Sequence, residues 1–530
     1  MKKTFAKKVL AAGLTASMAL GTAACGSSAD TQTTTTTSTT SSEDAKGDPV
    51  TINVMVWDRG NAAPGTTTED NALTQWIQEQ MLENFNITVN YTAVPRSESD
   101  DKLNIMMAGG SAPDIVFTYS QAMFSNFASS GALKDLTALY EEYGSDIETY
   151  CSEAEAQGIM GDTRYAVMKQ RGTENARHTA YIRKDWLDEL GMDVPTTKEE
   201  LGAYLYAVKE AGLGGDNTIP WAMSGREDTE KMYLNFVGSY VDLEDDREAY
   251  CYNEAYIIAN EDAKEGLEQL NEWYKDGLIS SDFATDTSED VYNAAVANGQ
   301  VGFVLDDTTA IWDEIEVLNN TLGVDETFIP CMPFELSDGT YRTPYEYRYA
   351  MYVMIPATTD DTKAEACMKY LNWLANPDNA VQVRYTPDYT TTDNGVAVEP
   401  TEDEKNEKGY PGTCDDLCIM NLNFDWVNDY DVLVATNLET QSSAWATEDW
   451  YKLYYETCQI GKFRYPTYAN LSEAEQTYGT DVENKMVQFV YQCIVASDFE
   501  TTYTNGMAEL NNSGLAEIIE ARGEYYDSVN

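Results

Sequence analysis

The sequence predicts an α/β fold, because short apolar strands and amphipathic helices alternate along its N-terminal part. Apolar side chains alternate at residues 50–57 and again at 87–93, which is typical of half-buried strands. A helix with one apolar face lies between them, and a second helix at 99–108 precedes a third strand at 115–117. This β-α-β-α-β order implies a parallel sheet covered by helices, and 530 residues suffice for two or three domains.

The next part of the chain contains two strands separated by a polar run, and then two helices. Strands are expected at 165–168 and 180–182, on either side of the polar residues 169–179. The first helix after them stops at Gly191. A polar, charged run between two buried strands is an unusual use of sequence, so this segment is a candidate functional element.

Two threonines can begin the following helix, because Thr196 and Thr197 each have a glutamate three residues later, as a capping box requires. Gly212 is a suitable end for this helix. Its apolar stripe must face a core and consists of Leu201, Tyr204, Leu205 and Val208.

The rest of the chain is mostly helical. A strand is expected at 301–305, and a helix at 364–374. Residues 388–413 are polar and contain proline and glycine, so they predict a loop or a crossing between domains. The last helix is expected at 515–529.

Composition excludes several classes of function. The chain has 90 acidic and 34 basic residues and a formal net charge of −56, so nucleic acid would be repelled. With one histidine, His178, it cannot build a histidine-based zinc site, and we expect neither a metal nor a cofactor. No phosphate-binding glycine–lysine loop and no G-x-S-x-G elbow is present, which argues against an enzyme.

The nine cysteines do not form a recognisable redox or metal motif. Cys414 and Cys418 are the only close pair, and their C-D-D-L-C spacing is not that of a redox C-x-x-C. Others, such as Cys367, lie in apolar helical patterns and are expected to be small core residues. The sequence leaves the pairing of the eight cysteines after Cys25 open.

The N-terminus has the pattern of a secretory signal. Four lysines precede a modest apolar run at 9–20, which is too short to span a membrane. Thr22-Ala23-Ala24-Cys25 resembles a bacterial lipobox, which implies lipidation of Cys25, with plain secretion as the alternative. Residues 26–48 are rich in Thr and Ser and are expected to form an unfolded tether.

Several segments of the sequence resemble one protein family. They read YIRKDWLDELG followed by VPTTKEEL, then GGSAPDIVF, MKYLNWLANPDNA and an Asn-Gly-x-Val-Gly unit at 298–302. Together they resemble the extracellular solute-binding proteins of bacterial ABC importers, specifically the large carbohydrate-binding group. The resemblance implies a two-lobed, periplasmic-binding-protein-like α/β fold with a helix-rich C-terminal part, each lobe holding a mainly parallel sheet flanked by helices.

The resemblance also implies a division of the chain. Residues 1–24 are expected to be the signal peptide and 25–48 the lipidated tether. Chain crossings would join the lobes, with one crossing in the polar run after residue 168 and a return crossing at 341–356. The expected lobes are 49–172 with 345–390 for lobe one, and 173–344 with 391–530 for lobe two.

Aromatic residues at strand ends and in the crossings are the candidate ligand contacts. The chain has 36 Tyr and 10 Trp, and a flat ring beside a hydroxyl-binding side chain suits a sugar. In open sheets ligands gather beyond the carboxyl ends of the strands. An arginine in a crossing can fork onto a hydroxyl pair or a carboxylate. The candidates are Trp57, Asp58, Tyr119, Arg171, Trp221, Asp307, Trp312, Tyr347, Arg348 and Trp426.

The resemblance implies a substrate-binding lipoprotein of an ABC transporter that captures an extracellular oligosaccharide and delivers it to a membrane permease. It would be a monomer held on the extracellular face of the cell membrane by its lipid anchor alone. A peptide or another small polar solute is the alternative ligand. A surface glycan-capture or sensor protein without transport, and a secreted carbohydrate-active enzyme, are the alternative classes.

Overall fold

The computed structural model describes residues 48–530, which form one compact unit. The description leaves out residues 171–175, 226–231, 308–309, 325, 346–348, 393–395, 423–433, 435–437 and 439–446. The predicted signal peptide and Cys25 also lie outside the described residues. In the described ranges, no helix is both long enough and apolar enough to cross a membrane.

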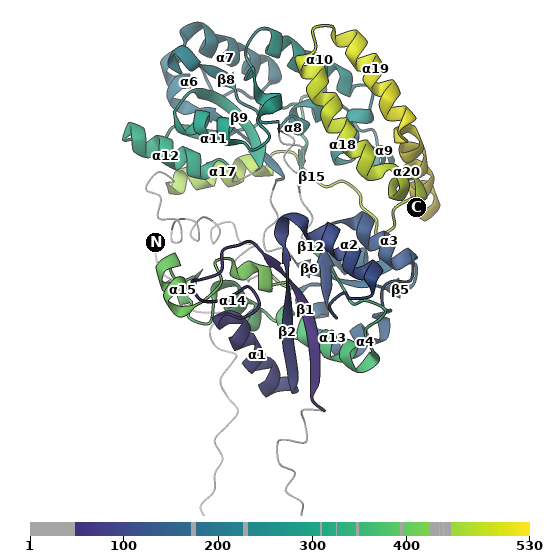
Figure 1. Cartoon of the computed structure of the whole chain (residues 1–530). Coiled ribbons are helices and arrows are strands. Elements are labelled where there is room, and N and C mark those ends of the chain that lie inside the picture. Colours follow the sequence, from purple (N-terminus) through teal and green to yellow (C-terminus); the bar gives the residue numbers. More distant parts are fainter. Residues whose placement is uncertain are drawn as a thin grey trace, which may run out of the picture. The chain divides into compact units, whose positions relative to one another are not determined.

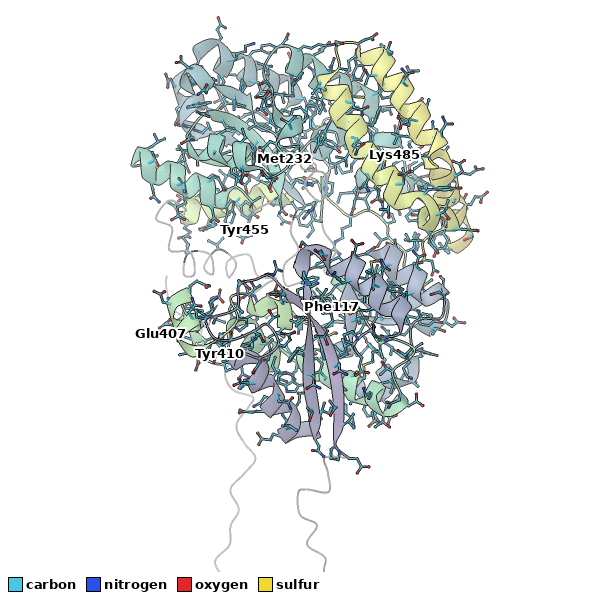
Figure 2. The ribbon with its side chains drawn as sticks, viewed as in Figure 1. Phe117, Met232, Glu407, Tyr410, Tyr455 and Lys485 are labelled. Carbon is cyan, nitrogen blue, oxygen red and sulfur yellow. The ribbon has the colours of Figure 1, made fainter. Side chains whose placement is uncertain are left out.

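Two separate hydrophobic cores define the two lobes of a periplasmic-binding-protein-like fold. Figure 1 shows the helices and strands that make up these lobes. The first core draws on residues 52–168, 351–383 and 410–420, and the second on 176–345 and 434–518. Figure 2 labels one member of each core, Phe117 in the first lobe and Met232 in the second.

The chain passes from one core to the other at three places. The flanking core residues are Met168 and Ala176, Tyr345 and Met351, and Met420 and Val434. The third passage therefore lies after residue 420 and not within 388–413 as expected. Assigning all of 391–530 to the second lobe is wrong, because Tyr410, Cys414 and Leu417 are buried in the first core.

The first lobe is built from short strands covered by helices. Its strands are β1 Val50–Asp58, β2 Ile87–Pro95, β3 Val116–Thr118, β4 Ile159–Met160, β5 Thr163–Arg164, β6 Ala166–Gln170, β12 Tyr349–Met354, β13 Thr390–Thr391 and β14 Ala397–Val398. Its α-helices are α1 Ala72–Phe85, α2 Ser99–Gly109, α3 Gln121–Ser129, α4 Thr137–Tyr143, α5 Ser145–Tyr150, α13 Asp361–Ala375, α14 Pro377–Tyr385 and α15 Glu402–Lys408.

The parallel start predicted from the sequence is confirmed. Strands β1 and β2 pair in parallel along their whole length, with Asp58 opposite Pro95. Ile115 continues this sheet, since it exchanges backbone hydrogen bonds with Asn53 and Met55 at 3.0 and 2.9 Å. Strand β12 then runs antiparallel between β3 and β6. The first lobe is therefore mixed and not mainly parallel.

The second lobe also contains a small sheet and many helices. Its strands are β7 His178–Arg183, β8 Ile219–Trp221, β9 Val301–Asp307, β10 Phe328–Cys331, β11 Thr343–Pro344 and β15 Lys462–Phe463. Its α-helices are α6 Lys184–Leu190, α7 Lys198–Ala211, α8 Leu234–Gly238, α9 Asp246–Cys251, α10 Ala263–Lys275, α11 Asp290–Ala297, α12 Trp312–Leu322, α17 Glu448–Gln459, α18 Glu473–Val495, α19 Phe499–Asn512 and α20 Leu515–Val529. Helices α10, α18 and α19 lie side by side (Figure 1).

The sheet of the second lobe departs from the expected topology. Its strand order is β10-β7-β9-β8, in which only the β8–β9 pair is parallel. A mainly parallel sheet was wrong here, because β7 begins the lobe between two antiparallel neighbours, β9 and β10, that come more than a hundred residues later. Local sequence patterns do not report the direction of such distant partners.

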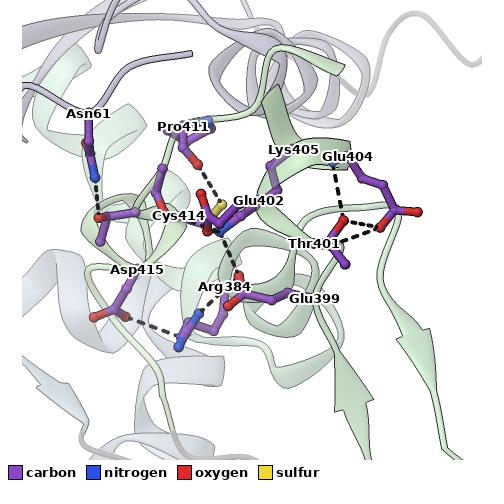
Figure 3. Close-up of polar contacts among 12 residues, drawn as sticks. Asn61, Arg384, Glu399, Thr401, Glu402, Glu404, Lys405, Pro411, Cys414 and Asp415 are labelled. Carbon is purple, nitrogen blue, oxygen red and sulfur yellow. Dashed lines mark hydrogen bonds and ion pairs between the residues drawn. The ribbon is translucent and has the colours of Figure 1, made fainter. Parts of the chain in front are cut away.

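Local capping signals account for two helices. Thr197 is the N-cap of α7 and accepts the backbone N–H of Glu200, whose carboxylate in turn accepts the N–H and hydroxyl of Thr196 at 2.8 and 3.0 Å. Helix α15 lies in the segment expected to be a loop. Its capping box, formed by Thr401 and Glu404, is the signal that the sequence interpretation missed (Figure 3).

All eight cysteines of the described unit are buried and free, which answers the question of pairing for this structure. Burial raises the pKa of Cys418 to about 12 and that of Cys458 to about 11. At pH 8, alkylation by iodoacetamide should be at least about a hundredfold slower in the native chain than in urea, because only the thiolate reacts. Mass spectrometry without reductant checks this; thiols that stay unmodified in urea would mean disulfides instead.

Candidate ligand site

Four strands of the first lobe end at the same edge of its sheet. Thr118 of β3 and Met168 of β6 both lie opposite Tyr352 of β12, so these two strands point the same way. Strands β1 and β2 run parallel to each other, and β1 runs parallel to the chain entering β3 at Ile115. The carboxyl ends of β1, β2, β3 and β6 therefore share one edge, where ligands of open α/β sheets bind.

An aromatic ring lies at the centre of this edge. Trp57, only 4% exposed, has its ring centroid 5.1 Å from that of Phe117, which packs edge-on from the core, and 5.3 Å from that of Tyr119. The guanidinium of Arg96, from the turn after β2, lies over the Trp57 ring at 4.1 Å and within 5.5 Å of the Tyr119 ring. Tyr119 remains 45% exposed, so part of this cluster is open to a ligand.

The residues that follow Trp57 shape the chain beside the cluster. Asp58 accepts hydrogen bonds from the backbone of Gly60 and the hydroxyl of Thr68, both at 2.9 Å. Arg59 forks onto Asp416 at 2.6 and 2.9 Å, which raises the pKa of the arginine. Asp58 thus organises its own loop, and Arg59 ties that loop to residues 414–417.

Residues 411–417 border this edge beside Trp57, and charge pairs hold the chain around them (Figure 3). Lys405 is almost fully buried and pairs with Glu399 and Glu402. Arg384 lies 3.9 Å from both Glu399 and Asp415. A pocket beside Trp57, lined by the end of β1, the loop after it and residues 411–417, has a volume of about 20 Å³, enough for one water but not for a sugar ring.

Several buried polar atoms at this edge have no hydrogen-bond partner in the described chain. They are both polar atoms of the Gln170 amide, the indole Nε1 of Trp57 and Nε of Arg96. Leaving such groups unsatisfied costs about 1–3 kcal/mol each. The Gln170 backbone, by contrast, is fixed by hydrogen bonds with Met420 and Leu422 at 2.7 and 2.9 Å. A ligand that carries donors and acceptors would remove this cost.

In the second lobe, the predicted strand end is also polar. Asp307 closes β9 and forms an ion pair with Arg177 at 3.1 Å, and it is partly exposed. Its neighbour Asp306 is buried and accepts the hydroxyl of Tyr292 at 2.8 Å. Asp307 therefore remains a candidate ligand contact, whereas Asp306 supports the strand from inside.

Two predicted contacts belong to the core of the second lobe. Trp221 is fully buried between Phe236, Trp273 and Phe303, so its assignment as a ligand contact is wrong. Trp312 is 8% exposed and packs on Trp450, with its indole N–H donated to a tyrosine hydroxyl at 3.0 Å. The assignment of Trp312 is also wrong, because both its ring and its donor are occupied by the protein.

The remaining candidates cannot be placed: Arg171, Tyr347, Arg348 and Trp426 lie outside the described residues. The structure adds two candidates that the sequence interpretation did not select, Arg96 and Gln170. The signal for Arg96 was its position directly after the second strand, the same rule that selected Trp57 and Tyr119. Gln170 belongs to the run expected to cross between lobes, where Arg171 was selected instead.

The chain belongs to the family of bacterial extracellular solute-binding proteins, whose model matches residues 64–381, more than half of its length. It is 27% identical over 230 residues to lipoprotein LipO of Bacillus subtilis, a match that covers 41% of this chain and 44% of LipO. It is 22% identical over 507 residues to the fructooligosaccharide ABC transporter substrate-binding protein FusA of Streptococcus pneumoniae, covering 85% of this chain and 86% of FusA.

The solved structure of another solute-binding protein has the same overall fold as this chain. An extracellular solute-binding protein from Bifidobacterium longum subsp. infantis aligns with a TM-score of 0.68 at 17% identity, covering 92% of this chain and 99% of that one. At this level of identity the likeness establishes the two-lobed architecture, and the ligand must be argued from the site itself.

Proposed function

We propose that this protein is the substrate-binding component of an ABC importer, that it captures an extracellular oligosaccharide, and that it has no catalytic role. The observation that carries the ligand class is the edge cluster of Trp57, Arg96 and Tyr119, together with the unpaired side-chain amide of Gln170 where β6 ends at the same edge of the sheet. A sugar ring has an apolar face that stacks on an aromatic ring and a rim of hydroxyls that need partners.

Binding would use both lobes. Asp307 and the candidates at 171, 347, 348 and 426 would add contacts from the second lobe and the crossings. A ligand that touches both lobes only when they close stabilises the closed state, which would then dock on the membrane permease. Lipidation at Cys25 would hold a monomer on the extracellular face of the membrane through residues 25–48.

The test of this function is thermal unfolding of the purified full-length chain with a panel of oligosaccharides and short peptides. A ligand at ~100 times its dissociation constant should add about 2.7 kcal/mol to the free energy of unfolding. Stabilisation by a peptide and by no sugar would favour the alternative ligand class. A sensor without transport would bind the same sugar, yet its loss would leave uptake of that sugar unchanged in the cell.

Replacing Tyr119 by alanine should weaken the oligosaccharide found by this panel about tenfold, because the exposed ring offers a stacking face at the strand end. Calorimetric titration measures the change. Tyr150→Ala is the matched control, since Tyr150 is similarly exposed in the same lobe but lies on α5. Equal affinities for Tyr119→Ala and the unmodified chain would remove this edge from the ligand site.

A further inference from the structure

Arg96 differs from the other arginines of the described chain in having no polar partner. Arginines elsewhere form ion pairs with carboxylates, as Arg59 does with Asp416 and Arg164 with Glu155. Arg342 instead donates to two backbone carbonyls. In the ranges that the structure describes, Arg96 donates to no carboxylate and no carbonyl, although the sequence has 90 acidic residues.

The protein nevertheless holds this guanidinium in one place. Its central carbon lies 4.1 Å from the centroid of the Trp57 ring and 5.5 Å from that of the Tyr119 ring, and its Nε is buried. Stacking on aromatic faces fixes the plane of the group without using its N–H donors. The aspartates around this edge are engaged elsewhere, because Asp58 accepts two hydrogen bonds from its own loop and Asp416 receives Arg59. Asp100 accepts the hydroxyl of Thr118 at 2.8 Å.

We infer that Arg96 binds a carboxylate of the ligand, so that the substrate is an acidic, uronate-containing oligosaccharide. This inference rests on the proposed function and specifies its substrate class. A neutral sugar could accept hydrogen bonds from Arg96 but would leave its charge uncompensated beside two aromatic rings. A carboxylate matches the planar fork of the guanidinium and neutralises it, and such charge-assisted pairs are about twice as strong as neutral hydrogen bonds.

The position of Arg96 also matters because the whole protein carries a large negative charge. A net charge of −56 repels an anionic ligand at long range, so an acidic sugar needs a local cation that no protein carboxylate has neutralised. Arg59 and Arg384 do not meet this need, since Asp416 and Asp415 lie next to them. Arg96 meets it at the edge where the stacking rings already lie.

The test is calorimetric titration of the full-length chain with acidic oligomers of three to six residues, built from galacturonate, glucuronate or mannuronate. Each is compared with its methyl ester, which keeps the sugar and removes the charge. Neutral gluco- and fructo-oligosaccharides complete the panel. At least one acidic series should bind about 10- to 100-fold more tightly than its ester, and this preference should vanish in Arg96→Gln. Arg247→Gln, which alters an exposed arginine in the second lobe, should leave the preference intact.

The remaining outcomes distinguish a failure of the acidic substrate class from a failure of the proposed oligosaccharide-binding function. Tight binding of neutral sugars or of the esters, with no preference for the acids, would overturn the substrate class while leaving the oligosaccharide function standing. An acid preference that survives Arg96→Gln would overturn the role of Arg96. If no saccharide binds at all, the proposed function fails together with this inference. Unfolding curves of the unliganded variants verify that Arg96→Gln remains folded.

Discussion

Replacing Trp221 by alanine is expected to lower the free energy of unfolding by about 3–5 kcal/mol and to leave ligand affinity unchanged. The indole is fully buried, with ring centroids of Phe236, Trp273 and Phe303 at 5.4, 5.9 and 5.0 Å. Its removal would leave a cavity inside the core of the second lobe. The loss should appear as a lower urea midpoint in circular dichroism.

The matched control is a tryptophan variant in the first lobe, whose loss of stability is compared with that of Trp221→Ala. Trp76 is partly exposed and packs at a tilt against the buried Trp373 of the first core, so Trp76→Ala should cost clearly less. If Trp221→Ala instead kept its stability and lost ligand binding, the ring would belong to the ligand site after all. The pair of variants thus tests the correction that the structure makes to the sequence interpretation.

The Trp221 error shows where sequence patterns stop being informative. Trp221 was assigned to the ligand with the other aromatic candidates, but β8 is a three-residue strand whose last two residues are buried. Such a short strand has too few positions to show which face is inside. The rule that ligands gather at strand ends did place Trp57 and Tyr119 at the carboxyl ends of their strands, because the long alternation of β1 fixes where that strand ends, and their contact with ligand stays a prediction.

The pairing of strands that lie far apart in the chain was the second feature that the sequence could not predict. The parallel start could be predicted because β1, α1 and β2 are consecutive and a βαβ unit has one favoured arrangement. The antiparallel partners of β7 and β12 come from distant segments, and no local pattern reports them. Arg96 and Gln170 are distinguished by the polar partners that they lack, and this property exists only after folding.

Replacing Arg522 by methionine should also cost about 3–5 kcal/mol, because it leaves a buried carboxylate without its cation. Arg522 of α20 pairs with Glu475 of α18, and both side chains are almost fully buried. The same guanidinium donates to the backbone carbonyl of Tyr250 in α9 and stacks on the ring of that tyrosine at 4.4 Å. Three helices of the second lobe therefore meet at one arginine.

A double variant separates the cost of the stranded charge from the loss of packing. Glu475 also completes a capping box with Ser472 at the start of α18, and glutamine can serve in that box. Arg522→Met combined with Glu475→Gln should therefore regain much of the stability that Arg522→Met alone loses, as urea unfolding can show. If the double variant is no more stable than the single one, the role of Arg522 is to bind Tyr250 and join α9 to α20, and the ion pair with Glu475 contributes little. In either case the site in the first lobe should bind its ligand unchanged, because these helices belong to the other core.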